Sequence, residues 1–260
     1  IVPAEAGETS LSLTVPVFET TPDTSDVRVA QMHVLFGFAE DGMEVKEIYA
    51  LSNLGDRTVR NGLTVPGKDG VKATVQFSLP EEAQYINFEP QAEGRFFKLP
   101  GGFADAAPLV PGQMVSQFLV NYLLPYTTPL TYRLKTVLPV ERVSFVVPKE
   151  SGLTLRGEGL GSPEQVTAQN GLVYDLYSME SLPAGMTVDL ALNGKLVLTE
   201  GQSITAVQPV SARQVPLVIG LAIMGVALIG GGTFWWVRSS KGWAENDLDD
   251  EDLVVASAEV

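Results

Sequence analysis

The one histidine of the sequence, His33, is the first residue to consider for metal or acid–base chemistry. It lies in the run VRVAQMHVLFGF, whose composition is typical of a β-strand. Met32, Met43 and Met114 offer soft sulfur ligands for a copper site with His33, but metal sites and proton relays usually bring several ligands together. A strand histidine whose hydrogen bonds are satisfied is therefore the favoured interpretation.

Two pairs of acidic residues have the ligand type that calcium prefers. Asp23 with Asp26, and Glu40 with Asp41, would place carboxylates in loops between strands. Neither pair has the spacing of a known calcium loop, and a solvated charge group at a hairpin tip explains both. We therefore expect no metal site and no cofactor.

The sequence contains none of the local motifs that mark common catalytic sites. G-x-S-x-G, H-E-x-x-H, a Walker loop and a dinucleotide fingerprint are all absent. A Ser–His–Asp triad would have to use His33, and no serine is marked to serve it. The absence of cysteine excludes disulfides, thiolate metal sites and thiol catalysis. We expect a protein that has no catalytic residues and is not an enzyme.

Aromatic residues give the sequence one unusual surface feature. Phe96, Phe97 and Phe103 surround the loop FFKLPGGF, and exposed rings there would be candidates for contact with a partner. The alternative, which we favour, is that these rings fill an open end of the β structure.

The elements that must position all these residues are β-strands. From Leu11 to Leu198, short runs rich in Val, Leu, Phe, Tyr and Thr are separated by Gly, Pro, Asn and Asp. This pattern predicts an all-β ectodomain of one or two antiparallel β-sandwiches. The expected strands are Leu11–Phe18, Val27–Phe38, Met43–Leu51, Val71–Leu79, Gln113–Leu124, Pro129–Leu138, Arg142–Val147, Leu172–Met179 and Met186–Leu192.

The expected organisation places an N-terminal segment at 1–10 and a β-sandwich at 11–138. Residues 139–205 form a second, smaller β unit or continue the sandwich, and 206–214 form a stalk. Asn193-Gly194 predicts a tight hairpin turn between TVDLAL and KLVLTE.

The run from Val215 to Val237 contains no charged residue. As a helix it would measure roughly 34 Å at ~1.5 Å per residue, which matches a hydrocarbon core of ~30 Å. We therefore predict a single C-terminal transmembrane α-helix at 215–237. Gly220, Ala227 and Gly231 fall on one face of that helix and are candidates for close packing against another helix.

The residues that flank this span predict its orientation. Arg213 alone precedes it, whereas basic and Trp residues cluster behind it, as is typical of the cytoplasmic interface. The predicted interface anchors are Trp235, Trp236, Arg238, Lys241 and Trp243. The N-terminal domain is therefore expected on the periplasmic or extracellular side, which requires an export signal, and the expectation is that the chain begins after its removal.

The charge distribution excludes one class of function. The formal net charge is −14, and the residues before the span's end hold 15 basic side chains (17 less two) and 24 acidic ones (31 less seven). Such a surface repels nucleic acid. The acidic cytoplasmic tail at 238–260 is a candidate for protein contact, through Asp249, Asp250, Glu251 and Asp252.

Three stretches carry a resemblance to known proteins: VKEIYALSNLGDRTV (45–59), FSLPEEAQYINF (77–88) and VPGQMVSQFLVNYLLPY (110–126). They resemble uncharacterised bacterial exported proteins of the Chloroflexi type, which have a β-sandwich ectodomain and one C-terminal transmembrane helix. In filamentous phototrophs this resemblance implies an accessory subunit of alternative complex III, the quinol-oxidising complex of photosynthetic electron transport. It implies no haem or iron–sulfur ligand in this chain.

The leading functional hypothesis is a non-catalytic, membrane-anchored accessory subunit of such an electron-transfer complex. Its partners would be the lipid bilayer and the membrane and exported protein subunits that it braces. The competing hypothesis is a free-standing cell-surface binding module that recognises a glycan, peptide or protein. A metal carrier that uses His33 and methionines is a third.

Overall fold

The computed structural model describes residues 16–39, 42–168 and 171–194, and nearly all of them belong to one compact unit. The described residues form β-strands and a single 3₁₀ turn, Lys149–Ser151, and include no α-helix. The expectation of an all-β fold for this part of the chain is therefore confirmed.

The longer strands are β2 (Val27–Ala39), β3 (Gly42–Asn53), β8 (Gln84–Glu89), β11 (Gly112–Leu124), β12 (Leu130–Lys135), β13 (Val140–Pro148), β16 (Val173–Leu182) and β17 (Thr187–Asn193). The shorter strands are β1 (Thr20–Thr21), β4 (Thr58–Val59), β5 (Leu63–Thr64), β6 (Lys72–Ala73), β7 (Val75–Ser78), β9 (Phe96–Leu99), β10 (Gly102–Asp105), β14 (Thr154–Gly157) and β15 (Glu164–Thr167).

One large sheet forms the first layer of a β-sandwich. Its seven strands have the order β15-β16-β13-β2-β3-β11-β8. β2 and β3 form a long antiparallel hairpin, whereas β2 and β13 run parallel. Strands that are distant in sequence therefore lie side by side in the middle of this sheet.

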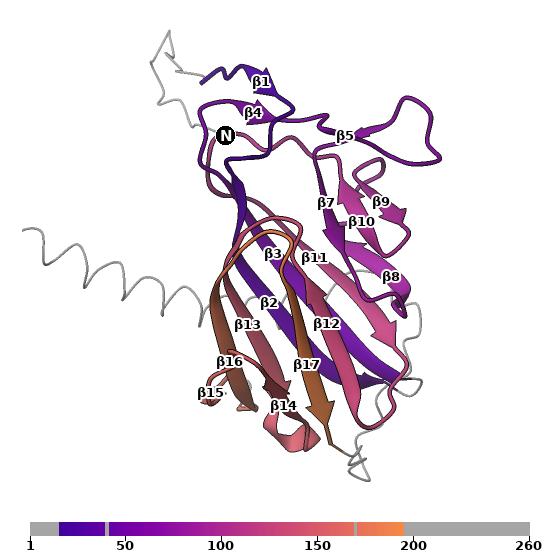
Figure 1. Ribbon diagram of the computed structural model, residues 1–260, viewed down its shortest axis with the longest axis vertical. Helices are drawn as coiled ribbons and strands as arrows, with labels where there is room; N and C mark the ends of the chain where they lie inside the picture. Colours follow the sequence, from indigo (N-terminus) through magenta and orange to yellow (C-terminus); the bar gives the residue numbers. More distant parts are fainter. Residues whose placement is uncertain (1–15, 40–41, 169–170, 195–260) are drawn as a thin grey trace, which may run out of the picture. The chain divides into compact units, whose positions relative to one another are not determined.

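Two three-stranded sheets form the second layer. The sheet β12-β17-β14 lies in front of the large sheet in Figure 1, and the sheet β7-β10-β9 lies beside it. Aromatic contacts join each small sheet to the large one: Tyr132 of β12 meets Phe36 of β2 with ring centroids 5.1 Å apart, and Phe77 of β7 meets Tyr49 of β3 at 4.8 Å.

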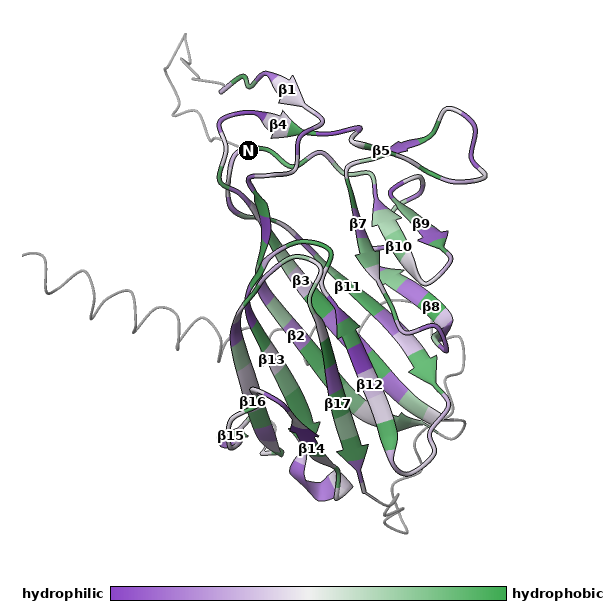
Figure 2. Cartoon of the chain, in the orientation of Figure 1, coloured by the Kyte–Doolittle hydropathy of each residue, from purple (hydrophilic) through white to green (hydrophobic). Residues whose placement is uncertain are grey.

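Alternation of side chains explains why the sequence forms these layers. On β3, Met43, Val45, Glu47, Tyr49 and Leu51 are all buried on one face, and the residues that alternate with them are on the opposite face. In the predicted strand Val71–Leu79, Ala73, Val75, Phe77 and Leu79 are buried, but Thr74 is buried too and Val71 is only half-buried, so the alternation is broken at Thr74. Hydrophobic residues concentrate on the long strands and polar residues on the loops (Figure 2).

The strands on both sides of Pro139 share the same sheets. β13 and β16 pair into the sheet that contains β2 and β3, and β14 and β17 pair into the sheet that contains β12. The segment after Pro139 therefore continues the sandwich in its described part.

The hairpin predicted at Asn193-Gly194 is wrong in its pairing. β12 pairs with β17 on one side and β14 pairs with Leu190–Asn193 on the other, so both edges at the end of β17 are occupied. Glycine is required at position 194 for a steric reason, because a Cβ there would lie 2.7 Å from the carbonyl oxygen of Gly152. A close approach of two backbone segments favours glycine just as a tight turn does, so the sequence Asn-Gly alone did not distinguish the two.

Several predictions fall on the other residues of the chain. Among the described residues, no helix has the length and hydrophobicity that crossing a membrane requires. The predicted span Val215–Val237, the stalk and the acidic tail lie outside the described residues. Residues 11–15 of the predicted strand Leu11–Phe18 also lie outside them, and the described Pro16–Phe18 are not in a strand.

Candidate functional site

Glu47 is a carboxylate buried among the apolar residues of the core. The alternation of β3 places it on the inner face of the large sheet, opposite Val34 of β2 and Val120 of β11. Both valines are fully buried, and Glu47 itself is 1% exposed. A carboxylate in such a position requires hydrogen-bond donors, because an unpaired buried charge is costly.

Three tyrosine hydroxyls supply these donors. Tyr49 donates to Oε2 of Glu47 at 2.6 Å, while Tyr122 and Tyr132 donate to Oε1 at 2.6 and 2.7 Å. Such short distances are typical of hydroxyl bonds to a charged carboxylate. We call Glu47 and these three residues the Glu47 cluster.

The Glu47 cluster lies where the three main sheets meet. Tyr49 is on β3 and contacts Phe77 and Phe103 of the sheet β7-β10-β9. Tyr122 is on β11 of the large sheet, and Tyr132 is on β12 of the other small sheet. One carboxylate therefore binds side chains from both layers of the sandwich.

Burial dominates the electrostatics of this cluster. It raises the pKa of Glu47 above its usual value, and the three tyrosine hydroxyls oppose that rise. Burial, followed by the nearby carboxylate, raises the pKa of each tyrosine well above its ordinary value. The tyrosines consequently remain neutral donors at physiological pH.

The cluster is closed to solutes. Glu47, Tyr122, Tyr132 and Tyr49 are between 0% and 3% exposed. General acid–base catalysis needs the carboxyl within hydrogen-bond reach of a substrate, directly or through one water. The arrangement instead joins the sheets by hydrogen bonds. The sequence carried a signal for it, since Glu47 is the one charged residue at an inward position of the alternating run Met43–Leu51.

A second buried carboxylate, Asp105 of β10, is held by a cation. Arg95 donates through Nε to Oδ1 at 3.0 Å and through Nη2 to Oδ2 at 2.9 Å. The same guanidinium donates to Ser116 Oγ of β11 at 2.9 Å and lies 4.6 Å from the ring centroid of Phe96. Asp105 is fully buried, and the pair ties a small sheet to the large one.

The three phenylalanines proposed for partner contact lie around this second pair. Phe103 is fully buried. Phe96 is half-buried and stacks on Phe88 of β8 with centroids 4.7 Å apart. Phe97 is half-buried and packs against a small cluster of Val65, Ala73 and Ala104.

His33 and Met32 are adjacent on β2 and therefore lie on opposite faces of the large sheet. Met32 is in the core, whereas His33 is on the outer face, beside Ile48 and Ser144 of the neighbouring strands. Burial lowers the pKa of His33. Its Nδ1 is buried and has no hydrogen-bond partner among the described residues, so the expectation of a satisfied histidine is wrong for this atom.

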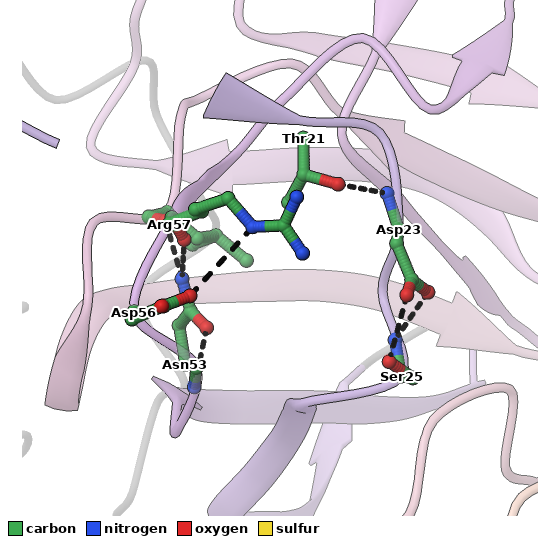
Figure 3. A network of polar contacts seen from close by, with 8 residues as sticks. Thr21, Asp23, Ser25, Asn53, Asp56 and Arg57 are labelled. Atoms are coloured by element: carbon green, nitrogen blue, oxygen red, sulfur yellow. Dashed lines mark hydrogen bonds and ion pairs between the residues drawn. The ribbon is translucent and has the colours of Figure 1, made fainter. Parts of the chain in front are cut away.

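Figure 3 shows the surroundings of Asp23, one of the acidic residues considered for calcium, whereas Glu40 and Asp41 lie outside the described residues. The Asp23 carboxylate accepts bonds from the Ser25 backbone N–H and hydroxyl, both at 3.0 Å, and these bonds lower its pKa. Asn53 is fully buried and donates to the carbonyls of Arg57 and Leu109 at 2.8 and 2.9 Å. Within the described ranges no three histidine, aspartate or glutamate side chains converge on a metal-sized site.

One open depression lies beside the sheet β12-β17-β14, with a volume of about 380 Å³. Tyr177 of β16 and Arg156 of β14 are both among the residues that line it. Its lining residues are Thr154–Gly157, Leu160–Pro163 and Tyr177. The depression is large enough for a small polar ligand.

The remaining predicted site residues lie outside the described residues. They are Gly220, Ala227, Gly231, Trp235, Trp236, Arg238, Lys241, Trp243, Asp249, Asp250, Glu251 and Asp252.

No family model matches the chain, and no curated protein matches it. A solved structure from Parabacteroides distasonis ATCC 8503, described as "a putative protease", is similar over 66% of this chain with 14% sequence identity and a TM-score of 0.33. The chain spans 41% of that protein's length, and a likeness of this size assigns neither a fold family nor an activity.

Proposed function

We propose that the chain is a non-catalytic, membrane-anchored accessory subunit whose β-sandwich acts through contact with other proteins. One observation carries the proposal. The buried carboxyl group of Glu47 is enclosed by three tyrosines and helps to join the sheets. Glu47, and likewise Asp105 with Arg95, thus help to hold the scaffold together.

The anchor completes this proposal. The uncharged run Val215–Val237 would hold the sandwich at the outer surface of the membrane, with Arg238 and Lys241 on the cytoplasmic side. Gly220, Ala227 and Gly231 would let a neighbouring helix approach closely. The acidic tail would then be available to a cytoplasmic partner.

We propose alternative complex III as the first assembly to test. The support is the resemblance of residues 45–59, 77–88 and 110–126 to exported proteins of Chloroflexi-type bacteria. In that role the chain would brace the exported and membrane subunits of the quinol-oxidising complex.

Purification of the full chain in mild detergent, with native electrophoresis and mass spectrometry, tests this function. Co-migration with redox subunits is the expected result, and migration without them contradicts the proposal. Replacing Gly220, Ala227 and Gly231 by leucine should reduce the co-purified material at least several-fold, because bulky side chains keep helices apart. Ala222→Leu, on the opposite side of the predicted helix, is the matched control.

A second candidate is a free-standing binding module, favoured by the depression beside β14 and Tyr177. A screen of the full chain against glycans and short peptides would test it. Binding that is weakened by Arg156→Ala and Ser162→Ala, in a chain that migrates alone, would favour this function over the accessory subunit.

A further inference from the structure

β14 is an edge strand of the sheet β12-β17-β14. Among the described strands it pairs only with β17, so its other edge has no partner strand in that part of the chain. The unpaired edge of a strand presents backbone N–H and C=O groups that can bind a further strand. All four residues of β14, Thr154–Gly157, line the depression described above, so the opening lies along the strand itself.

The side chains of β14 alternate between two environments. Leu155 is buried in the core, whereas Thr154 and Arg156 on either side of it are exposed on the outer face of the sheet. All three line the depression. An occupant of the depression therefore meets both faces of β14, as a strand added to its edge does.

The outward side of the depression holds a cation that lacks an acidic partner. The cross-strand row of Arg156 continues through Ala191 of β17 to Thr131 of β12, and neither of these is charged. Asp189, two positions before Ala191, is bound by Arg133 at 2.7 Å. Arg156 is thus left without an ion pair among the described residues. Because opposite charges that face each other stabilise a pair of strands, an acidic side chain opposite Arg156 would complete this row.

The inward side of the depression is apolar around one polar atom. Leu155 is buried, and Leu160 packs against the core. Tyr177 of β16 is only 6% exposed, yet no hydrogen bond joins its hydroxyl to another residue of the described ranges. Buried tyrosine hydroxyls usually have a partner. Because Tyr177 lines the depression, an occupant can supply that partner.

We propose that an extended peptide segment of a partner protein binds in this depression as a fourth strand beside β14. Backbone groups of the peptide pair with the open edge, one acidic side chain lies opposite Arg156, and its apolar neighbours point inward toward Leu155 and Tyr177. The four residues of β14 extend about 13 Å, which matches a peptide of four or five residues. Glu158 and Glu164 flank the lining segments without lining the depression, so the site suits one acidic side chain and not a run of them. The inference rests on the second function proposed above, the binding module, and specifies its ligand.

A five-residue peptide, TVEVT with an N-terminal fluorophore and a C-terminal amide, tests this proposal. The sequence reads the same in both directions, so a parallel or an antiparallel addition places the acidic side chain outward and both valines inward. Fluorescence anisotropy with the detergent-solubilised full chain should show saturable binding. The same peptide methylated on its backbone nitrogens should not bind, because it cannot donate the main-chain hydrogen bonds of an added strand. Absence of binding by TVEVT, or equal binding of the methylated peptide, would overturn the proposal.

A charge reversal locates the site on the chain. Arg156→Glu should weaken the binding of TVEVT at least several-fold, since like charges would then face each other, and should restore binding to the peptide TVKVT. Lys68→Glu, at an exposed cation outside the depression, is the matched control and should change neither affinity. Thermal unfolding of both variants verifies that the fold is kept, and unchanged binding of TVEVT in Arg156→Glu contradicts the inference. If the chain binds glycans in the screen described above but not TVEVT, the binding-module function stands and the strand addition falls.

Discussion

The sandwich buries two carboxylates and stabilises them in different ways. Asp105 is at the flank of the core, where a guanidinium binds both of its oxygens and the Ala107 backbone N–H donates to Oδ1 at 2.9 Å. Glu47 is at the centre, where three hydroxyls surround it and no cation is in contact with it among the described residues. Near the edge, Arg95 keeps 18% of its side chain exposed. At the centre, neutral tyrosines complete the hydrogen bonds without adding a second charge to the core.

The largest expected effect comes from removing the cation of the flank pair. Arg95→Ala should lower the free energy of unfolding by about 3–5 kcal/mol, because it leaves Asp105 buried and uncompensated. Chemical denaturation of the variant measures this. Arg133→Ala, which breaks the exposed pair with Asp189, should change stability little. Equal losses in the two variants would show that burial does not distinguish the pairs.

Removing one hydroxyl donor at the centre should have a smaller effect. Tyr132→Phe should cost about 1.5–3 kcal/mol, since a hydrogen bond to a charged group is lost while the ring remains. Tyr85→Phe is the control, because Tyr85 is 73% exposed. A Tyr132→Phe variant as stable as the parent would show that two donors suffice for Glu47.

The pH dependence of stability should separate the two carboxylates further. Because burial raises the folded pKa of Glu47 above 4.5, its contribution to stability is full below that pH and declines as the pH rises through the folded pKa. Glu47→Gln should therefore remove a decline in stability that the parent shows above pH 4.5. Denaturation curves at successive pH values would measure it, and parallel pH profiles of parent and variant would contradict the assignment.

The smallest signal is spectroscopic. The chain has seven tyrosines, and three of them, Tyr49, Tyr122 and Tyr132, have a pKa well above 10. In an alkaline titration, tyrosinate absorbance from these three should appear only as the protein unfolds. Ionisation of all seven in one step below the unfolding pH would show that the central cluster is open to hydroxide.

The sequence predicted the fold better than it predicted the interior. The long strands were found because apolar alternation is regular in segments such as Val27–Phe38 and Met43–Leu51. Short strands such as β9 and β14 were missed, since four residues contain too little alternation to recognise. Thr74 divides the single predicted strand Val71–Leu79 into β6 and β7, a break that follows from tertiary pairing.

The candidate site shows a sharper limit of sequence analysis. The chemistry of Glu47 depends on Tyr122 and Tyr132, which are 75 and 85 positions away in the chain. A glutamate at an inward strand position is visible in the sequence, but its three donors appear only when both layers are assembled. The same is true of Arg95, whose partner Asp105 resembles an ordinary loop residue at the end of PGGFAD (100–105).

The parallel pairing of β2 with β13 has a consequence for how the chain is made. Val29 and Val140 are neighbours in the large sheet and 111 positions apart (140 less 29). At a synthesis rate of ~5–20 residues per second, the free edge of β2 would wait roughly 6 to 20 seconds for its neighbour to leave the ribosome. Until then the β2–β3 hairpin offers an open edge to any other nascent chain, so we expect a holding chaperone to be needed most in that interval.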